Sequence, residues 1–479
     1  MQGSITHIDG RCRILVGLCA ALAAGLTLWF GMCFGAVSFL LPFALFVLLL
    51  TVLYPRIVFV ALFGLMPLSV PFSTVLPNLG ADFWLPTEPI VALYMVLLLL
   101  SQRQFWSSIR IVAKTFLFLL ILLYISLLVL SAMNSTLWLV SAKYVLVRLW
   151  FVAVFFVWAY VELKNNPKCL RQILWLYVMG VSVVAVYTMV RQYSAGLFDR
   201  QVAQYSCTPF FPDHTSYGAA LAFALPMALA LATSATRLVS RLLALFLSLM
   251  LSVALVLSFT RAAWVGLAVG SLVWACCLVR MQPRTAVAFM LLLICAVGIG
   301  WPSIMASMRN TEAESTGGLQ HLRSVTNITT DESNLERLNR WSCAWQMFRQ
   351  KPLLGFGPGT YQFVYAQYQQ AQMLTGASTN RGDRGNAHSE YIGLLAECGA
   401  PAALVFTLLV LVAALGGLGV VQKMQRGSHR AMLMGLLVGF TAYAIHSALN
   451  NFLDMDKLAA PFWLTMAVVA VWNTTEQSV

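Results

Sequence analysis

The chain has 479 residues, of which 60% are hydrophobic and only 10% are charged, and its formal net charge is +13. A soluble globular domain carries about 25% charged residues, so this composition excludes an ordinary soluble protein. Apolar runs long enough to cross a bilayer as helices recur along the chain, and the strand alternation of a membrane barrel is missing from the sequence. The positive charge indicates the cytoplasmic loops of a membrane protein rather than a nucleic-acid partner.

Hydropathy predicts about 14 membrane spans, with an error of about two. In chain order the spans are expected at 14–30, 36–53, 57–70, 87–101, 111–131, 143–161, 170–190, 216–233, 238–258, 262–279, 285–301, 401–421, 431–449 and 458–473. The first run lacks a clear small-residue cleavage site and leads directly into another span, so we expect no cleavable signal peptide. The two short spans, 57–70 and 262–279, are re-entrant or fused in an alternative interpretation that changes the count in pairs.

Loop charges predict the orientation of these spans. With the N-terminus in the cytoplasm, one set of loops collects the basic residues, among them Arg56, Arg103, Lys164, Arg237, Arg280 and Lys423. The opposite loops collect the acidic residues Asp82, Glu88, Asp199, Asp213, Asp454 and Asp456. Because cytoplasmic loops are enriched in Lys and Arg, both termini are expected in the cytoplasm, and the loop at 302–400 outside, in the periplasm of a Gram-negative cell.

The sequence therefore predicts an all-α fold, a polytopic helical integral membrane protein with about 12–14 transmembrane helices and one large, mostly helical periplasmic loop. The expected parts are an N-terminal helix bundle at 1–301, the loop at 302–400 and C-terminal helices at 401–479. The ten cysteines show no metal-binding spacing. A disulfide among Cys207, Cys343 and Cys398, on one predicted side of the membrane, is left open.

The loop holds an amphipathic pattern of helical spacing. The expected apolar face consists of Leu335, Leu338, Trp341, Trp345 and Phe348. Arg337 and Arg340 lie one turn apart on the expected polar face, where they are able to act together. Pro352 ends this helix, and a second helix with an aromatic face is expected from Tyr361 to Tyr368.

Two short motifs resemble nucleotide sites without matching them. GFGPG, at residues 355–359, predicts a tight turn, but it follows no strand and lacks the Lys-Ser/Thr of a phosphate-binding loop. DMD, at residues 454–456, resembles the acidic pair of nucleotide-sugar transferases. It is predicted to lie outside the cell, where nucleotide sugars are absent, so a solvated loop is the preferred interpretation.

Several cations lie inside the predicted spans or at their outer ends, against the charge trend: Lys143, Arg148, Arg191 and Arg261. Such charges cost roughly a few kcal/mol to insert and are usually functional. Each one either pairs with an acid such as Asp199 or Asp213, snorkels to the lipid surface, or shares an anion with the others. We favour a shared anion, because guanidinium groups bind phosphate bidentately. A polyprenyl pyrophosphate carries its charge at this depth.

The motifs of the loop resemble a known family. RLNRWSCAWQMFRQKPLLGFGPGTY, followed by HSEYIGLLAECGAPA, resembles the O-antigen ligase and Wzy-type polymerase superfamily, and SFTRAAWVGL resembles its arginine-bearing segment before the loop. These motifs cover about a quarter of the chain. By position His388 matches the family histidine, Arg261 the arginine before the loop, and Arg337 or Arg340 the arginine of the loop helix. The chain departs from the pattern at Ser389, where many relatives have asparagine.

The resemblance implies a glycosyltransferase that needs no metal or cofactor. It would move a glycan from undecaprenyl pyrophosphate to a sugar hydroxyl at the periplasmic side, with inversion at the anomeric carbon. The acceptor is lipid A–core in ligases and a second lipid-linked glycan in polymerases. HSEY leans towards a polymerase. Membrane lipids are expected partners and nucleic acid is not, and the sequence does not say whether a chain-length regulator associates.

Within this hypothesis His388 acts as the general base, or binds the pyrophosphate in its protonated form. Stabilisation of the leaving pyrophosphate is assigned to Arg148, Arg191 and Arg261. Holding of the donor or acceptor is assigned to Lys143, Arg337, Arg340, Arg381 and Arg384. Glu390 is a second candidate base or simply favours the start of its helix, and Tyr361 either stacks on a sugar ring or packs within the loop.

Two other classes of protein remain as alternatives. A flippase or transporter for lipid-linked oligosaccharides would also use intramembrane arginines, but it has less need of a large external loop. A receptor or scaffold leaves the charges in the spans unexplained. Replacement of His388 distinguishes a flippase or transporter from a glycosyltransferase, because a flippase should tolerate that change.

Overall fold

The computed structural model describes residues 40–75, 83–100, 103–282, 332–371 and 385–476, with a few isolated positions between them. In these ranges nearly all secondary structure is helical, which confirms the predicted all-α fold. The one strand pair there is short and antiparallel, with Val70 opposite Leu85 and Pro71 opposite Trp84. The predicted span 14–30 lies outside the described residues, and nearly all of 285–301 does too.

The first part of the chain forms helices that follow the predicted apolar runs. Their bounds, with those of the strands, are α2 Leu40–Leu53, α3 Pro55–Leu65, η2 Met66–Leu68, β1 Val70–Pro71, α4 Phe72–Val75, β2 Trp84–Leu85, α5 Thr87–Leu99, α6 Arg103–Val112, α7 Phe116–Met133, α8 Trp138–Val152, η3 Ala153–Trp158 and α9 Ala159–Asn165. The second part comprises α10 Cys169–Ala195, α11 Arg200–Ser206, α12 His214–Ser234, α13 Leu238–Leu257, α14 Arg261–Leu278, α17 Glu332–Gln350, α18 Tyr361–Val364, η4 Tyr365–Tyr368, α19 Glu390–Lys423, α20 Ser428–His446 and α21 Asp456–Glu476.

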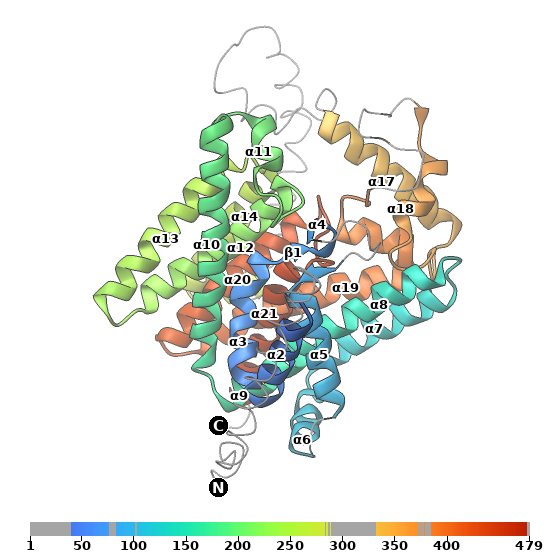
Figure 1. Cartoon of the computed structure of the whole chain (residues 1–479). Coiled ribbons are helices and arrows are strands. Elements are labelled where there is room, and N and C mark those ends of the chain that lie inside the picture. The colour runs from blue at the N-terminus through green and yellow to red at the C-terminus, as the bar shows by residue number, and fades with distance from the viewer. Residues whose placement is uncertain are drawn as a thin grey trace.

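Among the described residues, seven helices are long and apolar enough to cross a membrane. They are α7, the continuous run Trp138–Asn165, α10, α12, α13, α14 and α19. Figure 1 shows α10, α12 and α13 on one side of the molecule and α7, α8 and α19 on the other, with α17 and α18 above α19. This arrangement is that of a polytopic membrane protein, as the hydropathy predicts.

One predicted span is shorter in the structure than expected. The run 57–70 forms the 11-residue helix α3, a single 3-10 turn and then strand β1. A helix of 11 residues rises about 16 Å, roughly half of the hydrocarbon thickness. The other short run, 262–279, forms the 18-residue helix α14 and remains a candidate span.

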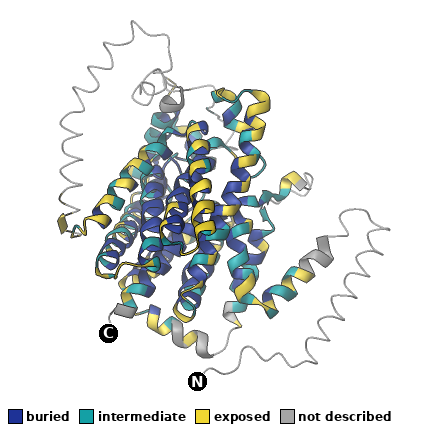
Figure 2. Cartoon of the chain, turned by 90° about the vertical axis from the view of Figure 1, so that its left-hand side faces the viewer, coloured by how far each residue is buried: buried dark blue, intermediate teal, exposed yellow. Residues whose placement is uncertain are grey.

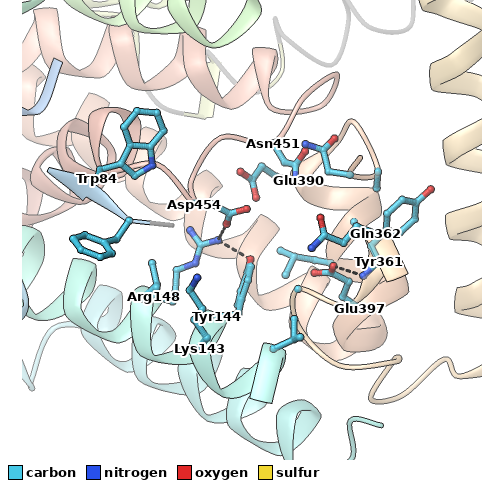
Figure 3. A pocket seen from close by; sticks show the side chains of 18 of the residues that line it. Trp84, Lys143, Tyr144, Arg148, Tyr361, Gln362, Glu390, Glu397, Asn451 and Asp454 are labelled. Carbon is cyan, nitrogen blue, oxygen red and sulfur yellow. Dashed lines mark hydrogen bonds and ion pairs between the residues drawn. The ribbon is translucent and has the colours of Figure 1, made fainter. Parts of the chain in front are cut away.

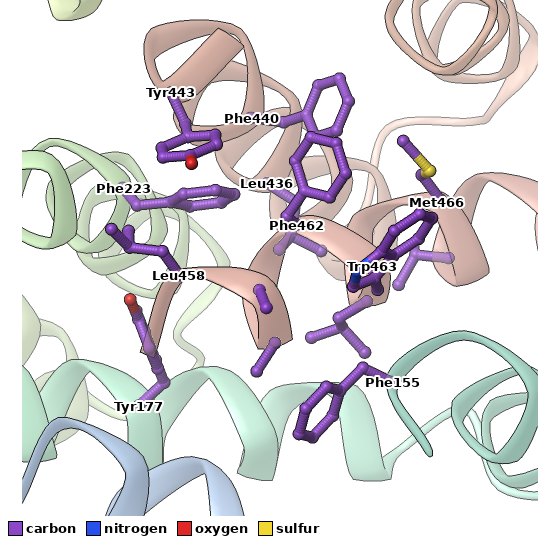
Figure 4. Close-up of a cluster of buried hydrophobic side chains, with 14 of the residues drawn as sticks. Phe155, Tyr177, Phe223, Leu436, Phe440, Tyr443, Leu458, Phe462, Trp463 and Met466 are labelled. Carbon is purple, nitrogen blue, oxygen red and sulfur yellow. The ribbon is translucent and has the colours of Figure 1, made fainter. Parts of the chain in front are cut away.

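The C-terminal helix α21 lies in the centre of the bundle. It packs against α9, η3, α19 and α20, and Trp463 and Phe462 are almost fully buried. The Phe462 ring stacks on Phe440 of α20 at a centroid distance of 4.9 Å, within the aromatic cluster of Figure 4. Figure 2 shows this buried interior surrounded by exposed residues, and many of the exposed residues are large and apolar, such as Leu242, Phe246 and Leu249. An apolar outer surface is expected where helices face lipid.

Small residues bring α20 close to its neighbours. A Cβ at Gly266 of α14 would overlap the backbone carbonyl of Ala442, and one at Gly439 would overlap Phe223 of α12. Helices in membranes associate through such close contacts, because lipid gives no hydrophobic driving force between them. The tight packing of α12, α14 and α20 fixes the helix ends on which the site is built.

Helix α17 covers the end of α19 and has its own small core. The buried residues of this core are Cys343, Ala344, Met347, Phe356, Tyr361, Tyr365, Ala387 and Ala396. The predicted apolar face of α17 is wrong in part, because Trp345 is 53% exposed whereas Glu336 and Arg340 are buried. These two form an ion pair of 2.6 Å, so the charge of each is compensated inside the loop. The predicted second helix is only a four-residue turn of α-helix followed by a 3-10 turn.

The GFGPG segment forms the predicted tight turn and locks onto α19. Phe356 N donates to Ala396 O at 3.2 Å, and Gly357 N donates to Glu397 O at 2.8 Å. Helix α19 is interrupted two residues later at Gly399, where φ is 78°. Its first turns therefore belong to the covering layer, and its longer second part runs through the bundle.

Candidate functional site

A polar cavity of about 670 Å³ lies where α17–α19 meet α5 and α8. Four of the predicted site residues line it: Lys143, Arg148, Tyr361 and Glu390. Figure 3 shows Arg148, Tyr144 and Lys143 on one side and Tyr361, Gln362 and Glu397 on the other. The volume falls in the range of small-molecule sites.

Arg148 is buried on α8, and the connection between α20 and α21 compensates its charge. Its Nη1 donates to Leu453 O at 2.9 Å, and its Nη2 donates to Asp454 Oδ1 at 3.1 Å and to the hydroxyl of Tyr144 at 2.6 Å. Only 2% of the Arg148 side chain is exposed, against 55% for Asp454. The sequence proposed Asp199 or Asp213 as acids that pair with such arginines; the acid that pairs with Arg148 is Asp454, while Asp199 and Asp213 cap α11 and α12.

The DMD motif is only partly the solvated loop that we expected. Asp454 is exposed, but it forms the ion pair with Arg148. Asp456 and Lys457 are fully buried at the start of α21. Lys457 Nζ donates to Met66 O at 3.0 Å and to Ser69 O at 2.7 Å, and it lies 4.4 Å from the ring centre of Trp84. The buried charges thus hold the strand pair against α21.

Glu390 begins α19 and binds the same connection. Its Oε1 accepts hydrogen bonds from Phe452 N at 2.9 Å and Leu453 N at 2.8 Å, while its own backbone N donates to Ser447 O. The preceding Ser389 caps the helix, since its hydroxyl accepts from Ile392 N. Glu390 therefore has an anchoring function in the fold as well as a place in the cavity wall.

Tyr361 is held mainly by packing. Its hydroxyl donates to Arg340 O at 2.8 Å, its ring stacks on Tyr365 at 5.1 Å, and 2% of it is exposed. Burial raises the pKa of this hydroxyl above its ordinary value. Tyr361 N donates to Glu397 Oε1 at 2.9 Å, which ties the aromatic turn to α19. Of the two roles predicted for Tyr361, the structure shows packing directly.

His388 lies in a second group of charged residues, which we call the histidine–arginine cluster. It consists of Asp213, His214, Arg261, Arg337, His388 and His446, linked by electrostatic interactions. Arg337 acts on all three histidines, and its Nε donates to Leu449 O at 3.4 Å. The cluster joins the ends of α12, α14, α17 and α20 to the segment before α19.

The backbone of His388 has an unusual conformation. Its φ is +48°, in the left-handed region that few non-glycine residues adopt. Its backbone N donates to Asn386 Oδ1 at 3.0 Å, and its backbone O accepts from the indole Nε1 of Trp341 at 3.4 Å. Burial, together with the positive charges of Arg340 and Arg337, lowers the pKa of His388 to about 4. The imidazole is therefore neutral at ambient pH.

Two predicted arginines are engaged in hydrogen bonds of the fold. Arg340 pairs with Glu336, donates to Asn386 O at 3.1 Å and lies 4.8 Å from the ring centre of Tyr365. Arg191 is exposed near the end of α10, where it donates to Ser206 O and Thr208 O. The structure thus places Arg148 in the cavity and Arg261 in the cluster, and it holds Arg191 against the turn after α11.

Some expectations have other outcomes. Arg381 and Arg384 lie outside the described residues. Cys207, Cys343 and Cys398 are free thiols. Within the described ranges, no three His, Cys, Asp or Glu side chains gather to hold a metal, and independence from metals stays a prediction. The sequence analysis did not single out His214 and His446. The only signal in the sequence is that each is a histidine near the end of a predicted span, on the same side of the membrane as His388.

The fold and the site define a polytopic helical membrane protein with a charged site at the ends of its helices. Residues 243–407 match the family model described as Wzy_C, O-antigen ligase, and this stretch includes the motifs that resemble that family. The match includes Arg261, Arg337 and His388. It indicates a role of the ligase or polymerase type in polysaccharide biosynthesis. No curated protein matches the chain.

Proposed function

We propose that the protein transfers a glycan from a polyprenyl pyrophosphate, such as undecaprenyl pyrophosphate, to a sugar hydroxyl. The observation that supports this most is the histidine–arginine cluster within and beside the family match. It offers cations for a pyrophosphate and a neutral imidazole for a proton. In this proposal the reaction takes place at the periplasmic face of a bacterial inner membrane, with both termini in the cytoplasm.

His388 serves as the general base in this reaction. Because its pKa is lowered to about 4, the neutral imidazole is ready to accept the proton of the attacking hydroxyl. The oxygen then forms a bond to the anomeric carbon while the bond to the pyrophosphate breaks, and single displacement inverts the anomeric centre. The alternative role, a protonated His388 that binds pyrophosphate, has less support since burial and two arginines favour the neutral form.

Arg261 and Arg337 stabilise the negative charge that develops on the leaving pyrophosphate. Guanidinium groups suit this task because they stay charged when partly buried. Glu390 is a poor second candidate for the base, since its carboxylate already accepts hydrogen bonds from Phe452 N and Leu453 N. The acceptor is lipid A–core for a ligase and a second lipid-linked glycan for a polymerase.

Replacement of His388 by alanine in cells tests this function. We expect normal protein levels in the membrane and the loss of the polymer made by the wild type. Single repeats on the carrier or on lipid A–core identify a polymerase, whereas long polymer on the carrier beside bare lipid A–core identifies a ligase. His429→Ala is the matched control, because His429 packs against Trp472, away from the cluster. Full-length polymer in His388→Ala would contradict the proposal and favour a flippase.

A further inference from the structure

The transfer reaction, as proposed, uses the histidine–arginine cluster and leaves the polar cavity without a task. The two features share one wall, the segment Gly385–Glu390. Ala387 and Ser389 line the cavity, while His388 between them interacts with Arg340 and Arg337. The connection after α20 is shared as well, since Leu449 O accepts from Arg337 and Asn451 lines the cavity. A glycan in the cavity would therefore lie next to the reacting centre.

The charges of the cavity do not suit a pyrophosphate. Four acids line it, Glu88, Glu390, Glu397 and Asp454, against two cations, Lys143 and Arg148. The Arg148 guanidinium already donates to Asp454, to Leu453 O and to Tyr144. An anion would meet more carboxyl groups than cations here, and one of the two cations, Arg148, is already engaged by the fold.

The other lining residues suit a sugar. Aromatic rings come from Phe83, Trp84, Tyr144, Trp150 and Tyr361, and side-chain amides come from Gln362, Asn386 and Asn451. Aromatic rings pack against the apolar faces of sugar rings. Carboxylates and amides accept hydrogen bonds from hydroxyl groups, and those to carboxylates are the stronger ones.

Two polar atoms in this lining are buried without a hydrogen-bond partner among the described residues. They are the indole Nε1 of Trp150, a donor, and the amide Oδ1 of Asn451, an acceptor. Buried polar atoms in folded proteins nearly always have a partner, so each such atom calls for one beyond the described residues. A hydroxyl group matches either atom because it both donates and accepts, and it meets these buried atoms when the side chain turns towards the cavity.

From these observations we infer that the cavity binds a sugar unit of the acceptor glycan, either uncharged or bearing an amino group, and that it excludes uronic acids and pyrophosphate. An ammonium group finds several carboxylates there, whereas a uronate is repelled by them. The assignment of the bound sugar to the acceptor glycan rests on the proposed function. The selectivity of the cavity itself depends only on its lining.

Saturation-transfer NMR on the purified full chain in lipid nanodiscs tests the inference. The probes are methyl glucoside, glucosamine, glucuronate and farnesyl pyrophosphate. We expect binding of the first two sugars, no binding of glucuronate, and binding of farnesyl pyrophosphate without competition from the sugars. Gln362→Leu and Asn451→Leu should each weaken sugar binding at least roughly tenfold, the effect of a lost hydrogen bond to a buried partner. Farnesyl pyrophosphate should bind both variants normally.

Two control variants separate this inference from the proposed function. Gln370→Leu removes an amide that donates to Ser342 and does not line the cavity, so sugar binding should not change. Arg261→Gln should weaken farnesyl pyrophosphate and leave the sugars unaffected. No sugar binding, or equal binding of glucuronate, would overturn the inference while the proposed function stands. Farnesyl pyrophosphate binding that ignores Arg261 would count against the proposed function and leave the sugar selectivity intact.

Discussion

Arg148 and Asp454 form an ion pair of 3.1 Å although 306 positions separate them in the sequence. The pair joins the middle of α8 to the connection between α20 and α21. It is asymmetric, because the arginine is buried and the aspartate is half exposed. Loss of the aspartate leaves a buried charge behind, whereas loss of the arginine leaves a carboxylate in contact with water.

This asymmetry predicts the result of a double-mutant cycle. Asp454→Asn should destabilise the protein by roughly 1–3 kcal/mol, and adding Arg148→Gln should recover part of that loss. Thermal unfolding of the purified variants in one detergent measures both effects. The exposed Arg56 and buried Glu162 form a pair of the same length elsewhere, so Glu162→Gln and Arg56→Gln give a matched cycle. Strictly additive losses at Arg148 and Asp454 would show that the pair is not coupled.

Hydropathy predicted which segments are helices, because a span needs an apolar run of a certain length and little else. It placed the start of one span at 401, directly after the interruption of α19 at Gly399, and it gave no account of Glu390 and Glu397 on the other side of this kink. These acids are tolerated because backbone N–H groups of distant residues, Leu453 and Tyr361, donate to them. Hydrogen bonds of this kind leave no signal in the local sequence.

The candidate site was predictable only where a motif carries it. His388, Arg261 and Arg337 were proposed from their motif context, and the structure links Arg337 electrostatically to His388 and Arg261 to His214. The buried face of α17 was not predictable from periodicity, because Glu336 and Arg340 are buried as a pair. Periodicity reports polarity residue by residue and contains no information about which charges compensate each other.

The tight turn at GFGPG makes a prediction about Gly357. Its φ is +115°, and a Cβ there would overlap the hydroxyl of Ser135. Gly357→Ala should therefore displace the turn from α19 and lower the amount of folded protein in the membrane several-fold, as for strain at a residue of positive φ. Gly427→Ala is the control, because no atom lies within 4 Å of the added Cβ and the backbone is extended. Equal accumulation of both variants, measured by fluorescence-detected size exclusion, would contradict this account.

The departure of Ser389 from the family pattern makes a second local prediction. Its hydroxyl caps α19, and asparagine caps a helix about as well as serine. Ser389→Ala should cost about 1 kcal/mol of stability, whereas Ser389→Asn should retain both stability and polymer synthesis. Thr115→Ala removes the corresponding cap of α7, at the same 3.3 Å distance, and should lower stability without changing the activity per folded molecule. Polymer synthesis lost in Ser389→Asn would show that this position does more than cap the helix.

The neutral state of His388 predicts how activity depends on pH. Burial and the charges of Arg340 and Arg337 lower the pKa of His388 from 6.5 to about 4 in the folded protein. As the pH falls, His388 therefore binds a proton in the unfolded chain before it does so in the folded protein. The contribution of the neutral His388 to the free energy of unfolding is present above about pH 6.5 and is lost between about pH 6.5 and pH 4. With His388 as the base, the rate of glycan transfer should be maintained down to about pH 4.

Arg337→Gln provides the test, because Arg337 is one of the two arginines that lower the pKa of His388, and it also stabilises the pyrophosphate in the proposed mechanism. The acid limb of the transfer rate should move from about pH 4 towards 6.5, while the maximal rate falls. Transfer rates at constant ionic strength, with unfolding monitored in parallel, measure the shift separately from the loss of stability. An acid limb already near pH 6.5 in the wild type would instead show that His388 is a base of ordinary pKa, which becomes inactive when its imidazole is protonated. A rate that rises as the pH falls through that range would assign His388 to binding the pyrophosphate.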